Sequence, residues 1–168
     1  MSTSCCPSPK TLEAGISFPF FVYNQSETGQ VEYHELGRES TEYMENGAYY
    51  ELKKCLNLDN ISKMAAFQPD WNGTGGLAFT DNAINLFRNI IEHIDKQPQI
   101  APTGRNSLLL QYELADKSML AFEVKENSVD SVYVPQGDFD AAQCETYKDD
   151  FIPKIAERVE RFYERESN

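Results

Sequence analysis

Apolar residues recur every three or four positions between residues 80 and 97, which predicts an amphipathic helix. These residues are Ile84, Phe87, Ile91 and Ile94. Thr80 stands just before the pattern, where a side-chain oxygen can cap the first turn, and Pro98 stands just after it, where a helix ends. This segment carries the strongest helical signal in the chain.

Two other segments show the same spacing less regularly. Between Ala48 and Phe67 the spacing breaks near residues 57–60, so we expect two short helices, with Asp59 or Asn60 as the N-cap of the second. A closing helix is expected from about residue 149 to 166, with Pro153 in its first turn. Its apolar face consists of Phe151, Ile155, Val159 and Phe162.

Residues 107–134 change to the alternation of strands and predict a three-strand antiparallel meander. A three-residue turn at 115–117 would place six apolar side chains on one face of the first two strands. These are Leu108, Leu110, Tyr112, Leu120, Phe122 and Val124. The opposite face then receives Gln111, Glu113 and Glu123. The third strand follows a turn at 126–127, and its facing stays open because its apolar residues fit no single register.

Together these elements predict an α+β fold, an antiparallel sheet of three or more strands with helices packed on one face. Residues 48–168 form the predicted core domain, in which 98–102 are read as a connector. Residues 1–47 are predicted to be a mobile arm with a β-hairpin within 16–36 and an acidic linker at 37–47.

The net charge of −12 is unevenly distributed along the chain. Acidic residues outnumber basic ones by seven to two in residues 1–50 and by eight to three in residues 106–148. Such a chain lacks the basic surface that binds phosphate backbones or anionic membranes, so neither partner is expected. The expected partner is a protein, and a basic one. The alternative is that the acidity only maintains solubility.

The four cysteines, Cys5, Cys6, Cys55 and Cys144, lack the spacing of a zinc site. The longest apolar run, Ile16 to Val22, is too short to span a bilayer, and no signal-peptide pattern precedes it. We therefore expect a cytoplasmic protein with reduced thiols, no metal and no other cofactor.

The most distinctive local string is Asp70-Trp71-Asn72-Gly73-Thr74-Gly75-Gly76. No Lys-Ser/Thr follows it and no strand precedes it, so neither a P-loop nor a dinucleotide-binding fingerprint is satisfied. We interpret it as a structural turn in which Trp71 enters the core, while Gly73 and Gly75 supply positive φ angles.

This turn is followed along the chain by two further motifs. The motifs are Trp71-Asn72-Gly73-x-Gly75-Gly76, Pro98-x-x-x-Pro102-Thr103, and a hairpin of Leu108-x-Leu110-x-Tyr112-Glu113 with Leu120-x-Phe122-Glu123-Val124. As a set they resemble a group of small bacterial proteins of uncharacterised function. The resemblance covers about residues 68–134 and departs from the group's pattern at Gly76, Leu110 and Ala121. It implies a shared fold and a bacterial setting linked to mobile elements or defence, and it supplies no catalytic residue.

Glu113 and Glu123 share the outer face of the predicted hairpin, with Gln111 and Ala121 between them. Two carboxylates on one face suggest either a docking surface or part of an acid/base or metal-binding site. The docking surface is favoured because no His, Asp or Cys is placed to complete such a site.

The leading hypothesis is a non-catalytic acidic protein that neutralises or regulates a bacterial or phage protein. It would act as an antitoxin, an immunity protein or an inhibitor, and mimicry of nucleic acid is a special case. The expected binding residues are Gln111, Glu113, Glu123 and Glu126. The alternative is an enzyme whose site is assembled from scattered residues, namely His93, Arg105, Glu113 and Glu123.

Overall fold

The computed structural model describes residues 24–25, 31–32 and 48–164. The chain separates into two units, residues 1–49 and 50–168, each described by itself. In the first unit, β1 (Asn24–Gln25) pairs antiparallel with β2 (Val31–Glu32), on either side of the turn of the predicted hairpin. The rest of that hairpin, the predicted mobile arm and the acidic linker lie outside the described residues.

The second unit is built on a five-stranded antiparallel sheet in the order β3-β4-β5-β6-β7. Its strands are β3 (Gln99–Thr103), β4 (Ser107–Glu113), β5 (Met119–Lys125), β6 (Ser128–Val134) and β7 (Gln143–Tyr147). Residues 99–102, expected as part of a connector, instead belong to strand β3. This strand tolerates Pro102 because it lies at the edge of the sheet, where one side needs no ladder hydrogen bonds.

The predicted register of the first two meander strands is confirmed. Leu108 lies opposite Val124, Leu110 opposite Phe122, and Tyr112 opposite Leu120. All six side chains are buried. The turn at 115–117 is closed by the Leu114 N–H, which donates to the Ser118 carbonyl at 3.0 Å. In β6, whose facing was open, Val129 joins this buried side opposite Val124.

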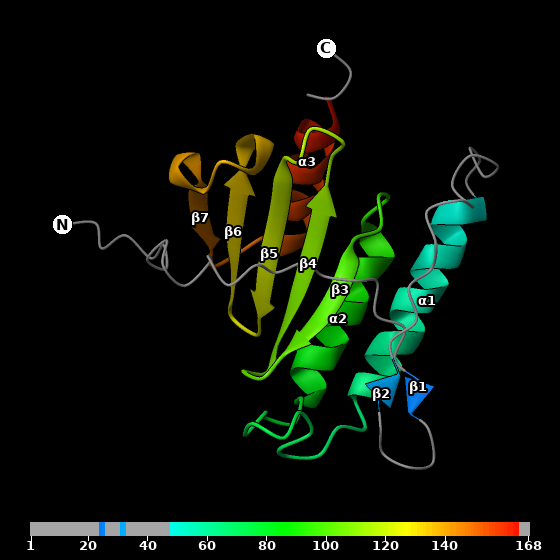
Figure 1. The fold of residues 1–168 in the computed structure, drawn as a ribbon. Helices are drawn as coiled ribbons and strands as arrows, with labels where there is room; N and C mark the ends of the chain where they lie inside the picture. Colours follow the sequence, from blue (N-terminus) through cyan, green and yellow to red (C-terminus); the bar gives the residue numbers. More distant parts are fainter. Residues whose placement is uncertain (1–23, 26–30, 33–47, 165–168) are drawn as a thin grey trace. The chain divides into compact units, whose positions relative to one another are not determined.

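The described helices are α1 (Ala48–Met64), α2 (Asp81–His93) and α3 (Phe151–Glu164). Figure 1 shows α2 and α3 on one face of the sheet and α1 beside α2. As predicted, the Thr80 hydroxyl oxygen caps α2 by accepting from the Ala83 N–H at 3.2 Å. At the other end of α2 the buried Gln97 amide donates to the carbonyls of Ile91 and Ile94, which satisfies groups that a helix end leaves unpaired.

Helix α1 is continuous, so the predicted break at 57–60 is wrong. The Asn57 side-chain amide donates to Gln97 Oε1 and to the Pro98 carbonyl, both at 3.1 Å. Asp59 pairs with Lys63 one turn later at 2.8 Å and caps no second helix. Asn favours helix ends when its side chain bonds the local backbone, but here the side chain is occupied by tertiary contacts.

The core lies between the sheet and the helices. One buried cluster contains Ile61 of α1, Phe87 of α2, Phe122 of β5 and Ile155 of α3, each 0% exposed. The predicted fold class is therefore confirmed: the unit is α+β, with helices packed on one face of an antiparallel sheet.

Two of the cysteines lie in the described residues. Cys55 is an exposed free thiol on α1. Cys144 on β7 is disulfide-bonded, so the expectation of reduced thiols is wrong for this residue. Among the described helices, none has the length and apolarity needed to cross a membrane.

Candidate functional site

The loop that contains Trp71 rests on an aromatic cluster at the margin of the core. Trp71 stacks on Phe67 with ring centroids 4.8 Å apart, and its Nε1–H donates to the Leu77 carbonyl at 3.0 Å. Trp71 is partly exposed and does not belong to the buried cluster. The prediction that Trp71 enters the core is therefore wrong. The indole stays at the margin because its N–H must reach a loop carbonyl.

Glycines and Asn72 determine the path of this loop. Gly73 and Gly75 have positive φ angles of 69° and 83°, as predicted. The Asn72 side-chain oxygen accepts from the N–H groups of Thr74 and Gly76 at 3.0 and 2.8 Å. A Cβ atom on Gly76 would lie 2.7 Å from that oxygen, so this position has no room for a side chain. The loop is therefore a structural turn.

One end of the sheet, at the β3–β4 and β5–β6 turns, carries carboxylates that are paired with cations. Glu123 accepts hydrogen bonds from Arg105 Nη2 at 2.8 Å and from the Ser107 hydroxyl at 2.7 Å. Lys125 Nζ lies 4.0 Å from the other Glu123 oxygen. Glu123 is only 19% exposed, so it is not a freely accessible acid.

Asp130 extends this network across β6. It accepts from Lys125 Nζ at 2.5 Å and from the Thr146 hydroxyl at 2.7 Å. Partial burial acts to raise the pKa of Asp130, but the hydrogen bonds from Lys125 and Thr146, with the Lys125 charge, bring the pKa below its ordinary value. We call this region the ion-paired end; its members are Arg105, Glu123, Lys125 and Asp130.

Two other predicted binding residues also have contacts within the protein. Glu126 lies in the β5–β6 turn and accepts a hydrogen bond from the Thr80 hydroxyl at the N-terminus of α2. A carboxylate is favoured at that end of a helix, so this contact has a structural role. Gln111 is partly buried on the outer face, between Gln99 and Ala121 on the flanking strands.

Glu113 lies at the opposite end of β4, in a row with Met119 and Val134 across three strands. The adjoining β4–β5 turn and the 3₁₀ turns η3 (Pro135–Gly137) and η4 (Phe139–Ala141) bring further carboxylates to this end. We call this region the acidic end; its carboxylates are Glu113, Asp116, Asp138 and Asp140. All four are exposed, and none forms an ion pair within the part of the chain that the structure describes.

Ser118 joins the two segments of the acidic end. Its N–H and hydroxyl donate to the two carboxylate oxygens of Asp116, at 2.8 and 2.9 Å. Its hydroxyl oxygen accepts from the Gln136 N–H at 2.9 Å. Ser118 is only 3% exposed, so this bridge is inside the protein and holds η3 against the β4–β5 turn. Carboxylates from two distant parts of the sequence are thereby held on one preorganised surface.

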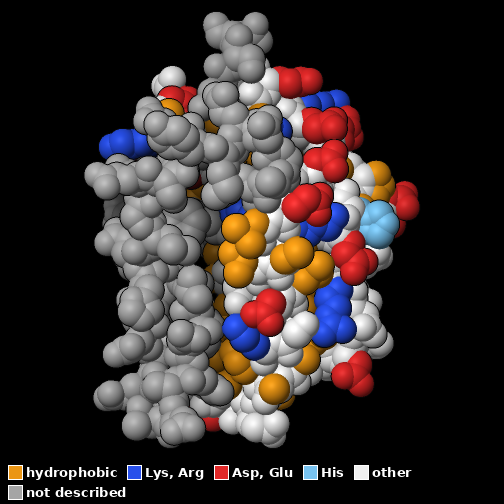
Figure 2. Space-filling model, turned by 90° about the vertical axis from the view of Figure 1, so that its right-hand side faces the viewer, with side chains coloured by type: hydrophobic (Ala, Val, Ile, Leu, Met, Phe, Trp, Pro, Cys, Tyr) orange, Lys and Arg blue, Asp and Glu red, His pale blue; other side chains and the backbone are white. Residues whose placement is uncertain are grey.

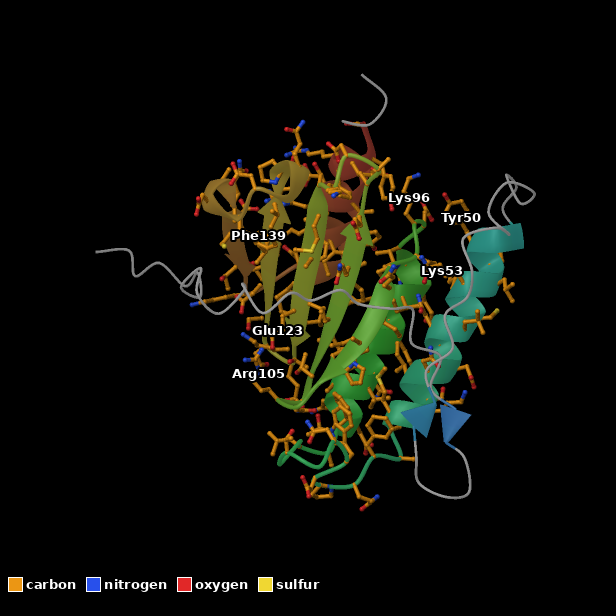
Figure 3. All side chains as sticks on the ribbon, viewed as in Figure 1. Tyr50, Lys53, Lys96, Arg105, Glu123 and Phe139 are labelled. Carbon is orange, nitrogen blue, oxygen red and sulfur yellow. The ribbon has the colours of Figure 1, made fainter. Side chains whose placement is uncertain are left out.

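An exposed aromatic side chain, Phe139, stands between Asp138 and Asp140. Its side chain is 44% exposed. In Figure 3, Phe139 lies above Arg105 and Glu123, which meet near the bottom of the sheet. Sequence reasoning missed Phe139 and the aspartates of the acidic end. The only signal was the excess of acids in residues 106–148, which gives no positions.

The scattered residues of the alternative enzyme hypothesis are brought together only in part. Arg105 and Glu123 are in contact, but the register places Glu113 at the other end of the strand. His93 is exposed at the end of α2, where its Nδ1 lies 2.7 Å from the Asn89 carbonyl oxygen. In the described residues, no three His, Cys, Asp or Glu side chains gather to hold a metal ion.

No protein-family model, curated protein or solved structure matches this chain. The resemblance to small bacterial proteins therefore stays a prediction.

Proposed function

We propose that this protein binds a basic protein partner without catalysis and neutralises or regulates it, as an antitoxin, immunity protein or inhibitor does. The observation that supports this proposal is the acidic end, where four exposed carboxylates lack internal ion pairs. Clustered charges of one sign repel one another, and they steer a partner of opposite sign into contact. The bacterial or phage setting of the partner rests on the resemblance alone.

The proposed contact differs from the one expected from sequence. Glu113 stays a binding residue, but Glu123 and Glu126 have partners inside the protein and Gln111 is partly buried. Phe139 adds an apolar anchor, because exposed aromatic side chains near the centre of an interface contribute most of its affinity. The partner surface that fits is an apolar pocket flanked by Lys and Arg. A nucleic-acid-binding protein offers such charges, which would make the acidic end a mimic of phosphates.

The test uses a partner captured from the source cell and compares two variants with equal charge changes. Glu113→Gln/Asp140→Asn removes two charges from the acidic end, and Glu51→Gln/Glu92→Gln removes two exposed charges from α1 and α2. We expect the first variant to slow association about tenfold and the control to change it less than about twofold. Raising the salt concentration should reduce the difference, because exposed charges are screened over about 8 Å at physiological ionic strength.

A second experiment distinguishes the effect of the carboxylates on association from the effect of Phe139 on dissociation. Phe139→Ala should raise the dissociation rate about tenfold or more and leave the association rate nearly unchanged. Equal association rates for both charge variants and the unmodified protein would contradict the proposal. The acidity would then be a solubility feature.

A further inference from the structure

The two edges of the five-stranded sheet are protected to different degrees. β3 forms one edge, and Pro102 within it has no backbone N–H to offer a further strand. Helix α1 lies at the start of this edge, where Asn57 donates to the Pro98 carbonyl at 3.1 Å. The side of the molecule seen in Figure 2, on which α1 lies, shows Lys and Arg side chains among acidic and hydrophobic ones. A proline and a covering helix both protect an edge from pairing with another chain.

β7 forms the other edge and has neither protection. No described helix or strand lies beyond it in the plane of the sheet (Figure 1). Its only charged side chain, Glu145, is paired with Arg158 of α3 at 2.7 Å, so it does not present an unpaired charge to an incoming strand. The strand contains no proline, and its exposed residues are Gln143, Cys144, Glu145 and Thr146.

The strand register identifies the backbone groups of β7 that point away from the sheet. Lys125 and Ser128 flank a two-residue turn and form a hydrogen-bonded pair, and such pairs alternate along antiparallel strands. By this alternation Glu145 bonds to β6, whereas the N–H and C=O groups of Thr146 point outward. Within the described residues, neither of these two groups of Thr146 has a hydrogen-bond partner. Unpaired groups at a strand edge are a template for pairing with another chain.

The disulfide bond of Cys144 leaves β7 in a different direction. Cys144 shares a row with Val132 and Ala121 on the outer face of the sheet. Side chains stand roughly perpendicular to a sheet, whereas an added strand lies in its plane. The edge is therefore defined by the backbone at Thr146.

This open edge is continuous with the acidic end. η4 ends at Ala141 and β7 begins at Gln143, so Asp138, Phe139 and Asp140 directly precede the strand. Both aspartates are exposed, and neither has a cation partner in the part of the chain that the structure describes. A strand added to β7 would lie beside these two negative charges at one of its ends.

We propose that β7 accepts an extended, basic segment of a partner protein as a sixth strand of the sheet, with Lys or Arg residues next to Asp138 and Asp140. Main-chain hydrogen bonds to Thr146 provide affinity, and the aspartates select for positive charge. A second copy of this chain fits the edge less well, because two copies that each carry a net charge of −12 repel one another. This inference rests on the proposed function for the basic character of the partner and adds the way in which the partner binds.

The probe is the synthetic peptide Lys-Lys-Val-Thr-Val-Thr-Val with blocked ends, and NMR of the full chain measures its binding. Saturating peptide should slow the exchange of the Thr146 amide with solvent at least about tenfold, because this N–H becomes hydrogen-bonded. A control peptide has proline at its fifth and sixth positions, one on each edge of the peptide strand. It keeps the charge and should not slow the exchange.

Two variants at one position test the role of the edge. Thr146→Pro removes the outward N–H, and Thr146→Val keeps that N–H while matching the loss of the hydroxyl, which donates to Asp130 at 2.7 Å. Thr146→Pro should weaken peptide binding at least about tenfold, and Thr146→Val should change it less than about twofold. The exchange measurement on the unmodified protein does not require either variant to fold. Unchanged exchange at Thr146, or equal slowing by the proline peptide, would overturn the added strand.

Asp138→Asn/Asp140→Asn distinguishes this inference from the proposed function, and it should weaken peptide binding about tenfold. Binding that needs both aspartates but ignores Thr146→Pro would rule out the added strand and leave the proposed function standing. Binding that is lost in Thr146→Pro but unchanged in the aspartate variant would retain the added strand and contradict both the basic partner and the proposed function. A dimer in ultracentrifugation that Thr146→Pro abolishes would assign the edge to a second copy instead.

Discussion

The two ends of the sheet both carry several carboxylates, but only one end neutralises them. At the ion-paired end, Arg105 and Lys125 contact Glu123 and Asp130. At the acidic end no carboxylate has a cation within ion-pairing distance in the described residues, although the exposed Lys117 lies in the same turn. Net charge therefore does not show which carboxylates are available to a partner, because availability depends on where the cations lie.

The ends also differ in what holds them together. The ion-paired end is held by charge-assisted hydrogen bonds between side chains on the sheet surface. The acidic end is held by the buried Ser118, whose uncharged N–H and hydroxyl donate to the Asp116 carboxylate, so no cation offsets the charge of the carboxylates there. An end organised in this way can have a defined shape and still carry an unbalanced charge.

The largest expected change in stability tests the alternation of inward-facing and outward-facing side chains along the strands, on which both ends of the sheet depend. Leu110 is fully buried, and Leu110→Asp places an unpaired charge in the core, so it should lower the free energy of unfolding by about 4 kcal/mol. Glu113→Gln, three residues along the strand on the outer face, should change it by less than about 0.5 kcal/mol. Chemical denaturation measures both. Equal losses would mean that the faces of β4 are assigned incorrectly.

A smaller effect compares the two ends directly. Glu123→Gln removes the charge that Arg105 and Lys125 contact and should destabilise the protein by about 1 kcal/mol, a value reduced by the exposure of these cations. The matched change at the acidic end, Glu113→Gln, breaks no ion pair and serves as the control. If the control were as destabilising as Glu123→Gln, the distinction between the ends would be lost.

The smallest expected effect concerns pH. Because the folded state lowers the pKa of Asp130, the ionised carboxylate stabilises the fold above its unfolded pKa, and this contribution is lost as the pH falls through the folded value. The stability difference between the unmodified protein and Asp130→Asn should be under about 1 kcal/mol at pH 7, since the pair is near the surface. It should shrink below about pH 4. Unfolding curves at both pH values test this, and a difference that grows on acidification would contradict the assigned pairing.

Parts of the fold could be predicted because their signals are local. The apolar spacing of α2 and its Thr80 cap lie within a few helical turns, and the alternation of β4 and β5 determines which side chains face the helices. Helix α1 was predicted as two pieces because Asn57 resembles a helix end until its partners, some forty residues away, are known. The edge strands β3 and β7 were missed because they are short and little buried.

The candidate site, like the fold, could be predicted from the sequence only in part. Alternation alone placed Glu113 and Glu123 on the outer face of the sheet, since a strand has only two faces. The sequence by itself thus determined the fold class, the inner and outer sides of β4 and β5, and the excess of negative charge. Only the tertiary structure decided that Arg105 neutralises Glu123 while Ser118 joins Asp116 to Gln136. The physical reason is that ion pairs and buried hydrogen bonds act over a few ångströms, and folding alone brings such distant residues within that distance.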